Sequence, residues 1–217
     1  MKEVRETTHK IKSDFDHIDI LINNAGARYL EHFVTTEGIE QTFAVNYLSH
    51  FLLTNLLVDR LKDSSSARII NISSGAHFSG DGIIENITSP KEYDGRKQYA
   101  NSKLANVLFT YQLARILENT NITVNAVDPG GVATNFARNN GLISWFKHRV
   151  YYLMKGNLLT PEQGCETVIY LATSPEVEGI TGKYFNYKKE TKSSSISYDS
   201  NIAKKLLETS EKITLQQ

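Results

Sequence analysis

A tyrosine and a lysine four residues apart, Tyr99 and Lys103, are the residues of this sequence best suited to acid–base chemistry. On a helix, residues at this spacing lie on one face, one turn apart. A phenol has a pKa near ~10, and a nearby ammonium group favours the phenolate and lowers that pKa. Tyr99 could then exchange a proton with a substrate oxygen while hydride moves at the carbon. Taken alone, the pair is weak evidence, because such pairs also occur in ordinary helices.

Other polar side chains lie where they can assist this chemistry. Ser73 and Ser74 follow a predicted strand directly, at the edge where open parallel sheets hold their sites. A hydroxyl there can hydrogen-bond the same substrate oxygen. Asn46 lies within a predicted long helix, where an Asn is unfavourable unless its amide has partners. We expect Asn46 either to hold a water that carries the proton onward from Lys103 or to make a local polar contact.

The elements that must position these residues alternate between helix and strand. Apolar periodicity, caps and turn residues predict helices over residues 2–15, 36–62, 98–117, 161–173 and 201–213, and strands over residues 18–22, 68–72, 122–127 and 182–187. The strands are apolar with little alternation, as strands buried on both faces of a parallel sheet are. The sequence therefore predicts one α/β domain with a parallel sheet covered by helices on both faces.

Composition excludes some partners and sites. Lys plus Arg number 24 and Asp plus Glu number 24, so the balance gives no reason to expect nucleic acid or an acidic membrane as a partner. The single cysteine, Cys165, cannot form an internal disulfide and has no second thiol for a metal site. We expect it to be a buried residue of a helix, because free cysteine usually behaves as a small hydrophobe. A reduced, intracellular compartment fits this cysteine usage.

The motifs together resemble the short-chain dehydrogenase/reductase family, whose members move hydride between a nicotinamide cofactor and a carbonyl or alcohol. The resemblance covers nearly the whole chain, and its motifs follow in family order, each at the end of the matching element: Asn23-Asn24-Ala25-Gly26, Asn46, Ser74, Tyr99, Lys103, Pro129-Gly130, Val132 and Thr134. It implies a Rossmann-like, doubly wound parallel sheet, with the family strand order 3-2-1-4-5-6-7.

The resemblance also implies a role for each matching residue. Tyr99 would be the catalytic acid/base, and Lys103 would lower its pKa and hold the nicotinamide ribose. Ser74, which matches the family better than Ser73, would position the substrate carbonyl, and Asn46 would support the water relay. The implied cofactor-binding residues are Asn23, Ala25, Gly26, Asn46, Tyr99, Lys103, Pro129, Gly130, Val132 and Thr134. No metal site is expected.

Within the family, residues 51–57, 101–106 and 174–179 look like the retinol dehydrogenase branch. That likeness implies retinoids or other lipophilic aldehydes and alcohols as substrates, with NADP(H) favoured over NAD(H). Relatives often carry His before the Pro-Gly pair, where this chain has Asp128. We also expect residues 141–159 to form a substrate lid, since they hold the apolar side chains Trp145, Phe146, Tyr151 and Tyr152. The alternative is a surface helix that packs on the body.

The family's Gly-x-x-x-Gly-x-Gly turn, which presents N–H groups to the cofactor pyrophosphate, does not occur in this sequence. The chain opens at what should be the helix before the family's fourth strand. We therefore expect residues 1–217 to be a single domain that lacks the first three strands and the dinucleotide-binding βαβ portion. Three interpretations stay open: a fragment of an active enzyme, a short isoform that binds a partner or substrate without catalysis, and an enzyme that holds cofactor differently.

Two further expectations follow from this organisation. The strand at residues 18–22 would lose its neighbour and expose an apolar edge, which favours self-association, unless the first helix folds over it. An intracellular location, cytoplasmic or associated with the endoplasmic reticulum, suits the resemblance. Membrane association through a missing N-terminal segment is compatible with it.

Overall fold

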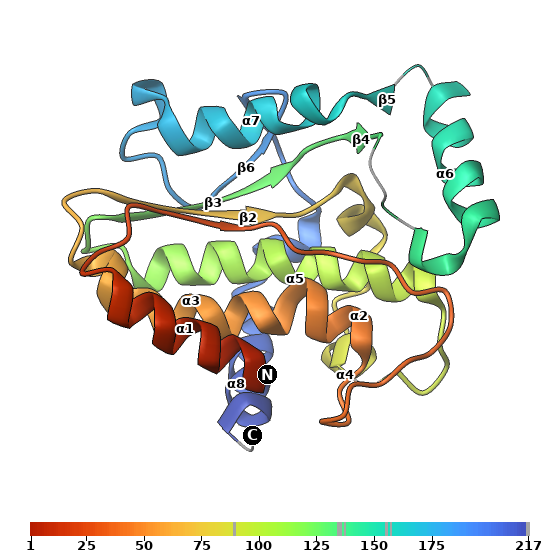
Figure 1. The fold of residues 1–217 in the computed structure, drawn as a ribbon, viewed down its shortest axis with the longest axis horizontal. Helices are drawn as coiled ribbons and strands as arrows, with labels where there is room; N and C mark the ends of the chain where they lie inside the picture. Colours follow the sequence, from red (N-terminus) through yellow and green to blue (C-terminus); the bar gives the residue numbers. More distant parts are fainter. Residues whose placement is uncertain (89, 134–135, 137, 155, 157, 216–217) are drawn as a thin grey trace.

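A parallel sheet forms the centre of the computed structural model, which describes all residues except 89, 134–135, 137, 155, 157 and 216–217 (Figure 1). Its four parallel strands lie side by side in sequence order: β1 (Ile20–Asn23), β2 (Ala67–Ile72), β3 (Ile122–Asp128) and β6 (Lys183–Asn186). The short strand β7 (Lys189–Glu190) joins β6 in the antiparallel direction. This arrangement confirms the predicted Rossmann-like α/β fold. The order β1-β2-β3-β6 matches strands 4, 5, 6 and 7 of the family order.

Helices cover the two faces of this sheet unequally. On one side lie α1 (Lys2–Asp14), α3 (Ser49–Lys62) and α5 (Gly95–Ile116), while α7 (Pro161–Thr173) lies on the other (Figure 1). The last helix, α8 (Ser200–Leu215), packs against α5. The largest apolar cluster lies between the sheet, α3, α5 and α8, and a smaller one lies beneath α7.

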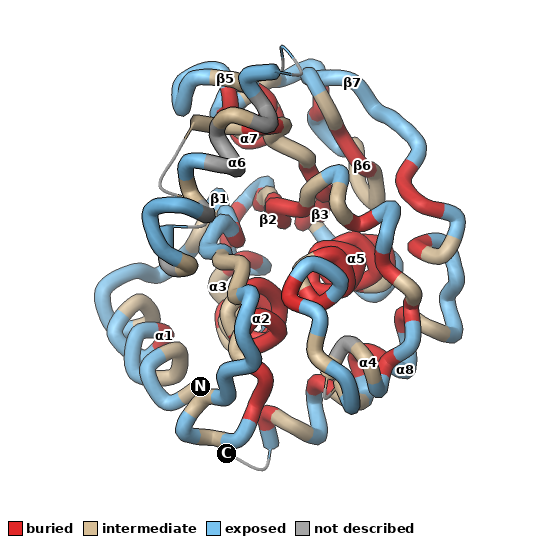
Figure 2. The backbone as a smooth tube through the Cα atoms, turned by 90° about the vertical axis from the view of Figure 1, so that its right-hand side faces the viewer, coloured by how far each residue is buried: buried red, intermediate tan, exposed pale blue. Residues whose placement is uncertain are grey.

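The helix α5 runs through the most buried part of the molecule (Figure 2). It begins at Gly95, earlier than predicted, because the Asp94 side chain accepts hydrogen bonds from the backbone N–H groups of Arg96 and Lys97. A Cβ on Gly95 would lie 2.1 Å from the carbonyl oxygen of Tyr29, so only glycine permits this approach. The start of α5 is thereby fixed against the loop that follows β1.

The predicted helix over residues 36–62 begins late in the structure. Glu40 accepts hydrogen bonds from the N–H groups of Thr42 and Phe43, so the first turn is α2 (Gln41–Phe43). A β-bridge between Val34 and Glu40 closes the preceding segment as a turn instead. One turn of π-helix, Ala44–Leu48, then precedes α3. Such turns inside helices are rare and occur frequently at functional sites.

Two segments that lie between the predicted helices and strands also contain helices. The loop after β2 holds the 3-10 helix η2 (Gly75–Ser79) and α4 (Ile84–Thr88), and the predicted lid holds α6 (Leu142–Met154). A two-stranded sheet of β4 (Gly131–Val132) and β5 (Leu158–Leu159) brackets the segment that contains α6. Both segments lie close to the carboxyl ends of the parallel strands.

The prediction for Cys165 was wrong, because this side chain is exposed. The predicted helix itself is confirmed as α7, with Thr160 in a capping box and Pro161 in the first turn. Its buried residues are Gly164, Thr167, Leu171 and Ala172. Cys165 lies one position beyond Gly164, which turns it away from the sheet.

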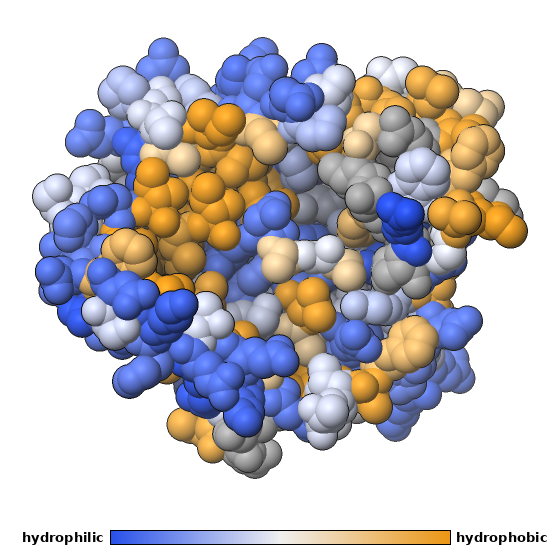
Figure 3. Space-filling view, viewed as in Figure 1, coloured by the Kyte–Doolittle hydropathy of each residue, from blue (hydrophilic) through white to orange (hydrophobic). Residues whose placement is uncertain are grey.

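The strand β1 is an open edge of the sheet among the described strands, since it pairs with β2 alone. Ile20 and Ile22 remain 41% and 42% exposed, and α1 packs on α3 instead of covering the strand. Apolar surface is visible between α7 and β1 (Figure 3). The expectation of helices over both faces therefore holds for β2 and β3 and fails at β1. Within the described part of the chain, no helix combines the length and apolar character that crossing a membrane requires.

Candidate active site

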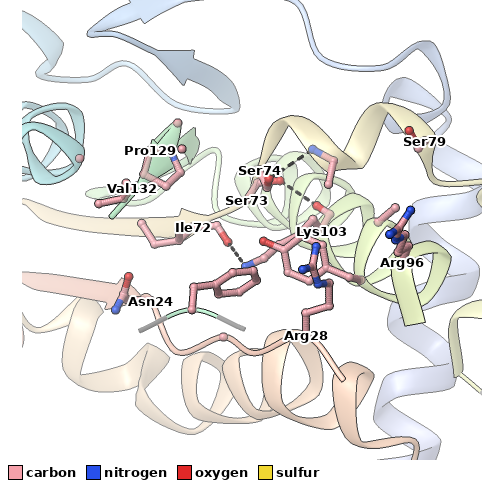
Figure 4. Close-up of a pocket in the computed structure, with 18 of the residues that line it drawn as sticks. Asn24, Arg28, Ile72, Ser73, Ser74, Ser79, Arg96, Lys103, Pro129 and Val132 are labelled. Carbon is pink, nitrogen blue, oxygen red and sulfur yellow. Dashed lines mark hydrogen bonds between the residues drawn. The ribbon is translucent and has the colours of Figure 1, made fainter. Parts of the chain in front are cut away.

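A cavity of about 1390 Å³ opens at the carboxyl ends of β1, β2 and β3 (Figure 4). The loops that follow these strands supply its floor, and the first turns of α5 and parts of α6 and α7 supply its walls. Sites for one small ligand usually measure roughly 300–1,000 Å³. The cavity is therefore large enough for a substrate together with part of a second molecule.

Tyr99 and Lys103 both line this cavity from α5. The Lys103 Nζ atom lies 5.8 Å from the centre of the Tyr99 ring, which confirms that the two side chains share a helix face. Phe136 also lies beside the phenol ring, at 5.4 Å between ring centres. Tyr99 is half-buried, so its ring is held by neighbours while remaining part of the cavity wall.

The ammonium group of Lys103 is buried at the cavity floor. The residue is 3% exposed, and Nζ donates a hydrogen bond of 3.0 Å to the carbonyl oxygen of Ile72 (Figure 4). Burial lowers the pKa of Lys103 to about 8, although the negative charge of Asp128 acts to raise that pKa. Lys103 is therefore a cation near neutral pH whose charge is more easily lost than that of a surface lysine.

The two serines after β2 differ in what their hydroxyl groups do. Ser73 is 2% exposed and donates to the carbonyl oxygen of Lys103 at 2.8 Å, which ties β2 to α5. The Ser74 Oγ accepts a hydrogen bond of 3.2 Å from the Ala76 N–H at the start of η2. That contact uses a lone pair and leaves the Ser74 hydroxyl proton available to a ligand. Both serines line the cavity, and the choice of Ser74 over Ser73 as the substrate-facing serine stays a prediction.

Asn46 is completely buried in the π-helical turn, and its amide has partners, as expected. Its Oδ1 accepts from the Ala27 N–H at 2.8 Å, and its Nδ2 donates to the Ala27 carbonyl and to the Ser102 Oγ at 2.9 Å each. Asn46 is not part of the cavity wall. A Cβ on Gly26 would lie 3.4 Å from Lys103 Nζ and 3.6 Å from Asn46 Oδ1, so this glycine keeps the space between them open.

The predicted cofactor-binding residues divide into two groups. Gly26, Pro129, Gly130 and Val132 line the cavity, whereas the exposed Ala25 does not. Thr134 lies outside the described residues.

Asn23 lies away from the cavity. Its Nδ2 donates to the Thr54 Oγ1 at 2.9 Å and to the Asn71 Oδ1 at 2.8 Å, within a buried network between β1, β2 and α3. The neighbouring Asn24 lines the cavity in its place. The alternation of side chains along a strand separates these two asparagines, one pointing to each side of the sheet.

The lining residues fit the nicotinamide end of a dinucleotide cofactor. Gly130 adopts a left-handed φ of +80°, and its N–H donates to the Asp128 Oδ1 at 2.9 Å, which shapes the turn after β3. Gly26 leaves open the space beside the Lys103 ammonium group, where a ribose hydroxyl would find a donor.

No sequence motif indicated that Arg28, His50 and Phe136 lie near the site. Arg28 lines the cavity, and its guanidinium lies 5.7 Å from the centre of the Phe136 ring. His50 is 4% exposed, and neither ring nitrogen has a hydrogen-bond partner among the described residues. Burial, and then the charge of Lys103, lower the pKa of His50 to about 3. Arg28 and Phe136 lie in loops, where no periodicity could have indicated their positions.

The family model described as short chain dehydrogenase matches residues 1–142, and the chain belongs to this family. It is 41% identical to "Retinol dehydrogenase 14" of Homo sapiens over 97% of this chain and 63% of that protein. It is 39% identical to "Polyprenol dehydrogenase" of Homo sapiens over 95% of this chain and 64% of that protein. The chain thus spans slightly less than two thirds of the length of these curated relatives.

The fold is also similar to solved structures. An uncharacterized protein of Mycobacterium paratuberculosis superposes with a TM-score of 0.73 at 25% identity, covering 97% of this chain and 72% of that one. These similarities place the chain in the retinol dehydrogenase branch of its family, as the sequence motifs indicated. The family uses a nicotinamide cofactor.

Proposed function

We propose that this protein interconverts an alcohol and a carbonyl compound with a nicotinamide cofactor. The observation that carries the proposal is the meeting of Tyr99, Ser74 and Lys103 at one cavity, from two separate elements of the fold. A phenol, a hydroxyl and a cation together can bind a carbonyl oxygen, protonate it and compensate the resulting charge.

In the direction of reduction, Ser74 donates a hydrogen bond to the substrate oxygen and holds it beside the Tyr99 phenol. The phenol gives its proton to that oxygen as negative charge develops there, and the Lys103 cation stabilises the phenolate that remains. A bound nicotinamide supplies the hydride. Asn46 keeps the π-helical turn fixed to the loop after β1 and supports the return of a proton through water near Lys103.

For the cofactor, we propose that Lys103 and Tyr99 hold the nicotinamide ribose, and that Pro129, Gly130, Val132 and Thr134 surround the nicotinamide. The turn from Asn23 to Gly26 would pack beside the ribose and adenosine through Gly26, which lines the cavity, while Asn23 and Ala25 lie outside the lining. Asn46 supports this loop from behind. A preference for NADP(H) over NAD(H) follows from the resemblance to the retinol dehydrogenase branch alone.

We propose a lipophilic alcohol or aldehyde as the substrate. The names of the relatives refer to retinol and polyprenol, which are both long apolar alcohols. Leu30, Phe136 and Ile143 supply apolar cavity surface, and the Phe136 ring lies 5.4 Å from the Tyr99 ring. Such a wall suits a hydrocarbon chain that leads its reacting end to Ser74 and Tyr99.

The second candidate is a protein that binds a lipophilic ligand or a partner without catalysis. It rests on the cavity alone, whose apolar residues Leu30, Phe136 and Ile143 would hold the ligand without any hydride transfer. Residues 1–217 would still form one domain with the cavity intact. We expect either protein to be intracellular, in the cytoplasm or at the endoplasmic reticulum, where a membrane could supply the substrate.

One pair of measurements separates the two candidates. Purified protein is titrated calorimetrically with NADPH and NADH, and turnover of retinaldehyde and of aldehydes of increasing chain length is followed through the cofactor absorbance. The proposed function predicts cofactor-dependent turnover. Binding of retinaldehyde without any nicotinamide dependence would contradict it and support the binding protein.

A further inference from the structure

His77 is completely buried, although it follows the cavity-lining Ser74 by only three residues. It belongs to η2, and its ring packs against Phe78 and Tyr184 at 4.1 Å and 4.8 Å between ring centres. A nitrogen of a buried imidazole that lacks a hydrogen-bond partner costs free energy, so the partners of the His77 ring bear on what holds it in place. The proposed reaction does not use this side chain.

Both nitrogens of the His77 ring have backbone partners. Nδ1 lies 2.7 Å from the carbonyl oxygen of Ser74, and Nε2 accepts a hydrogen bond of 3.0 Å from the backbone N–H of Ser194. The backbone N–H of His77 donates to the same Ser74 carbonyl at 3.0 Å. One residue therefore holds the Ser74 carbonyl at two points and reaches a segment 117 residues away.

These partners permit only one protonation state. A backbone N–H can only donate, so Nε2 must carry a lone pair, and a carbonyl can only accept, so Nδ1 must carry the proton. A protonated ring would set a second N–H against that of Ser194. Burial lowers the pKa of His77, against the Ser74 carbonyl and the charge of Asp128, which both raise it.

The segment that His77 reaches, residues 193–198, is itself attached to α5. The Ser193 Oγ lies 2.7 Å from the Tyr111 hydroxyl and 2.7 Å from the Ser197 Oγ, and all three groups are buried. Ser197 donates to the Ser194 carbonyl at 2.6 Å, which closes the turn that presents the Ser194 N–H. Tyr111 lies on the same helix as Tyr99 and Lys103, so the segment has a rigid connection to the helix that carries the proposed acid/base.

We propose that His77, in its Nδ1–H form, is a positioning residue that sets Ser74 against Tyr99. It does so by tying the Ser74 backbone to residues 193–198, which Tyr111 fixes to α5. The inference rests on the proposed function, because it assigns His77 a part in the same reaction. Its consequence is that a segment distant in sequence from every catalytic residue determines where the Ser74 hydroxyl meets the substrate oxygen.

The first test does not depend on activity. Long-range proton–nitrogen spectra of the histidine side chains, with His77 assigned by its loss in His77→Asn, report which ring nitrogen carries the proton. We expect a protonated Nδ1 and an unprotonated Nε2 at neutral pH, and a slowly exchanging Ser194 amide.

The variant His77→Asn keeps a donor near Ser74 but cannot reach Ser194. The hydrogen-exchange rate of the Ser194 amide should therefore rise about tenfold or more, while the spectrum remains that of a folded protein. An Nε2–H form, or a Ser194 amide indifferent to His77→Asn, would overturn the inference.

The second test separates positioning from general stability. His77→Asn should lower kcat about 10-fold to 100-fold with little change in the cofactor KM, because a small misplacement of a reacting group is sufficient for such a loss. In a Ser74→Ala background the same substitution should have almost no further effect on kcat, since its influence passes through Ser74. His9→Asn, on the exposed side of α1, is the matched control.

The results separate the positioning role of His77 from the proposed function of the protein. Equal kcat losses from His77→Asn with and without Ser74 would mean that His77 acts on folding or elsewhere, and would overturn the positioning role. Absence of turnover in the unsubstituted protein would contradict the proposed function, while the nitrogen spectra and Ser194 exchange would still decide whether the connection through His77 exists.

Discussion

The Lys103 ammonium group lies 5.8 Å from the centre of the Tyr99 ring, on the same face of α5. The backbone of that helix holds the pair at a fixed spacing, and the buried Nζ is held in turn by the Ile72 carbonyl at the end of β2. The acid/base candidate and its cation are thus attached both to a helix and to the sheet. Their relative position does not depend on any mobile surface side chain.

Replacement of Tyr99 by Phe removes only the phenolic oxygen. The ring should keep its packing against Phe136, so the melting temperature should change little. We expect kcat to fall about 100-fold or more, because the proton donor is lost while binding surface remains. Steady-state turnover and thermal unfolding of the same preparation check this prediction. A near-normal kcat would remove Tyr99 from the proposed mechanism.

The lowered pKa of Lys103 predicts a particular dependence of stability on pH. Below pH about 8 the lysine is protonated in the folded and unfolded states, and the cost of burying its charge is present in full. Between about 8 and the ordinary value of 10.5 the unfolded state binds more protons, so this lysine makes the free energy of unfolding rise with pH. Urea unfolding of the cofactor-free protein, compared with Lys103→Met at each pH, isolates the effect. Identical pH slopes for the two proteins would contradict it.

Local patterns were sufficient to predict most of the elements and the central pair of the site. The capping box at Thr160 and the spacing of Tyr99 and Lys103 depend on neighbours within one or two turns, so the sequence displays them directly. The late start of the helix at Gln41 escaped prediction, because it depends on the Glu40 side chain turning back to cap that helix.

Other features depend on contacts between distant parts of the chain. The exposure of Cys165 follows from the close packing of its neighbour Gly164. A Cβ on Gly164 would lie 2.4 Å from a Val132 methyl group, so the Gly164 side of α7 lies against β4 and Cys165 does not. The part assigned to His77 depends on Ser194, which no local pattern connects to it. Residue spacing carries no information about such contacts before the fold is known.

Gly95 supports a prediction about stability alone. A Cβ at this position would lie 2.1 Å from the Tyr29 carbonyl oxygen and 2.7 Å from the Leu30 Cα, and backbone atoms cannot turn aside as a flexible side chain can. We expect Gly95→Ala to lower the free energy of unfolding by about 1–3 kcal/mol. Chemical denaturation measures this change, with the exposed Arg96→Ala as the control for helix propensity. Stabilisation by Gly95→Ala would mean that the loop after β1 does not approach α5 so closely.

The proposed lid can be tested on α6. Ile143 lines the cavity, Trp145 is half-buried and Phe146 is 62% exposed, while the side chains of Tyr151 and Tyr152 lie outside the described residues. Replacing Trp145 and Phe146 by Ser should raise KM for long-chain aldehydes far more than for short ones, because only a long chain reaches this helix.

The matched control on the same helix is Leu153→Ser, since Leu153 is 65% exposed and is not part of the cavity wall. It should leave both KM values unchanged. Equal effects of the Trp145 and Phe146 substitutions on short and long aldehydes would instead assign α6 to packing on the body of the protein.

The open edge at β1 predicts self-association. Its outer N–H and C=O groups face no described strand, and Ile20 and Ile22 on the same strand are exposed. Such an edge readily pairs with another chain, whereas a charged side chain on it discourages pairing. Light scattering over a range of protein concentrations should show a rising average mass, and Ile22→Lys should reduce that rise. Ile116→Lys, at an exposed apolar position at the end of α5, should not. A monomer at every concentration, or an equal effect of the two substitutions, would show that β1 is not where copies of this chain meet.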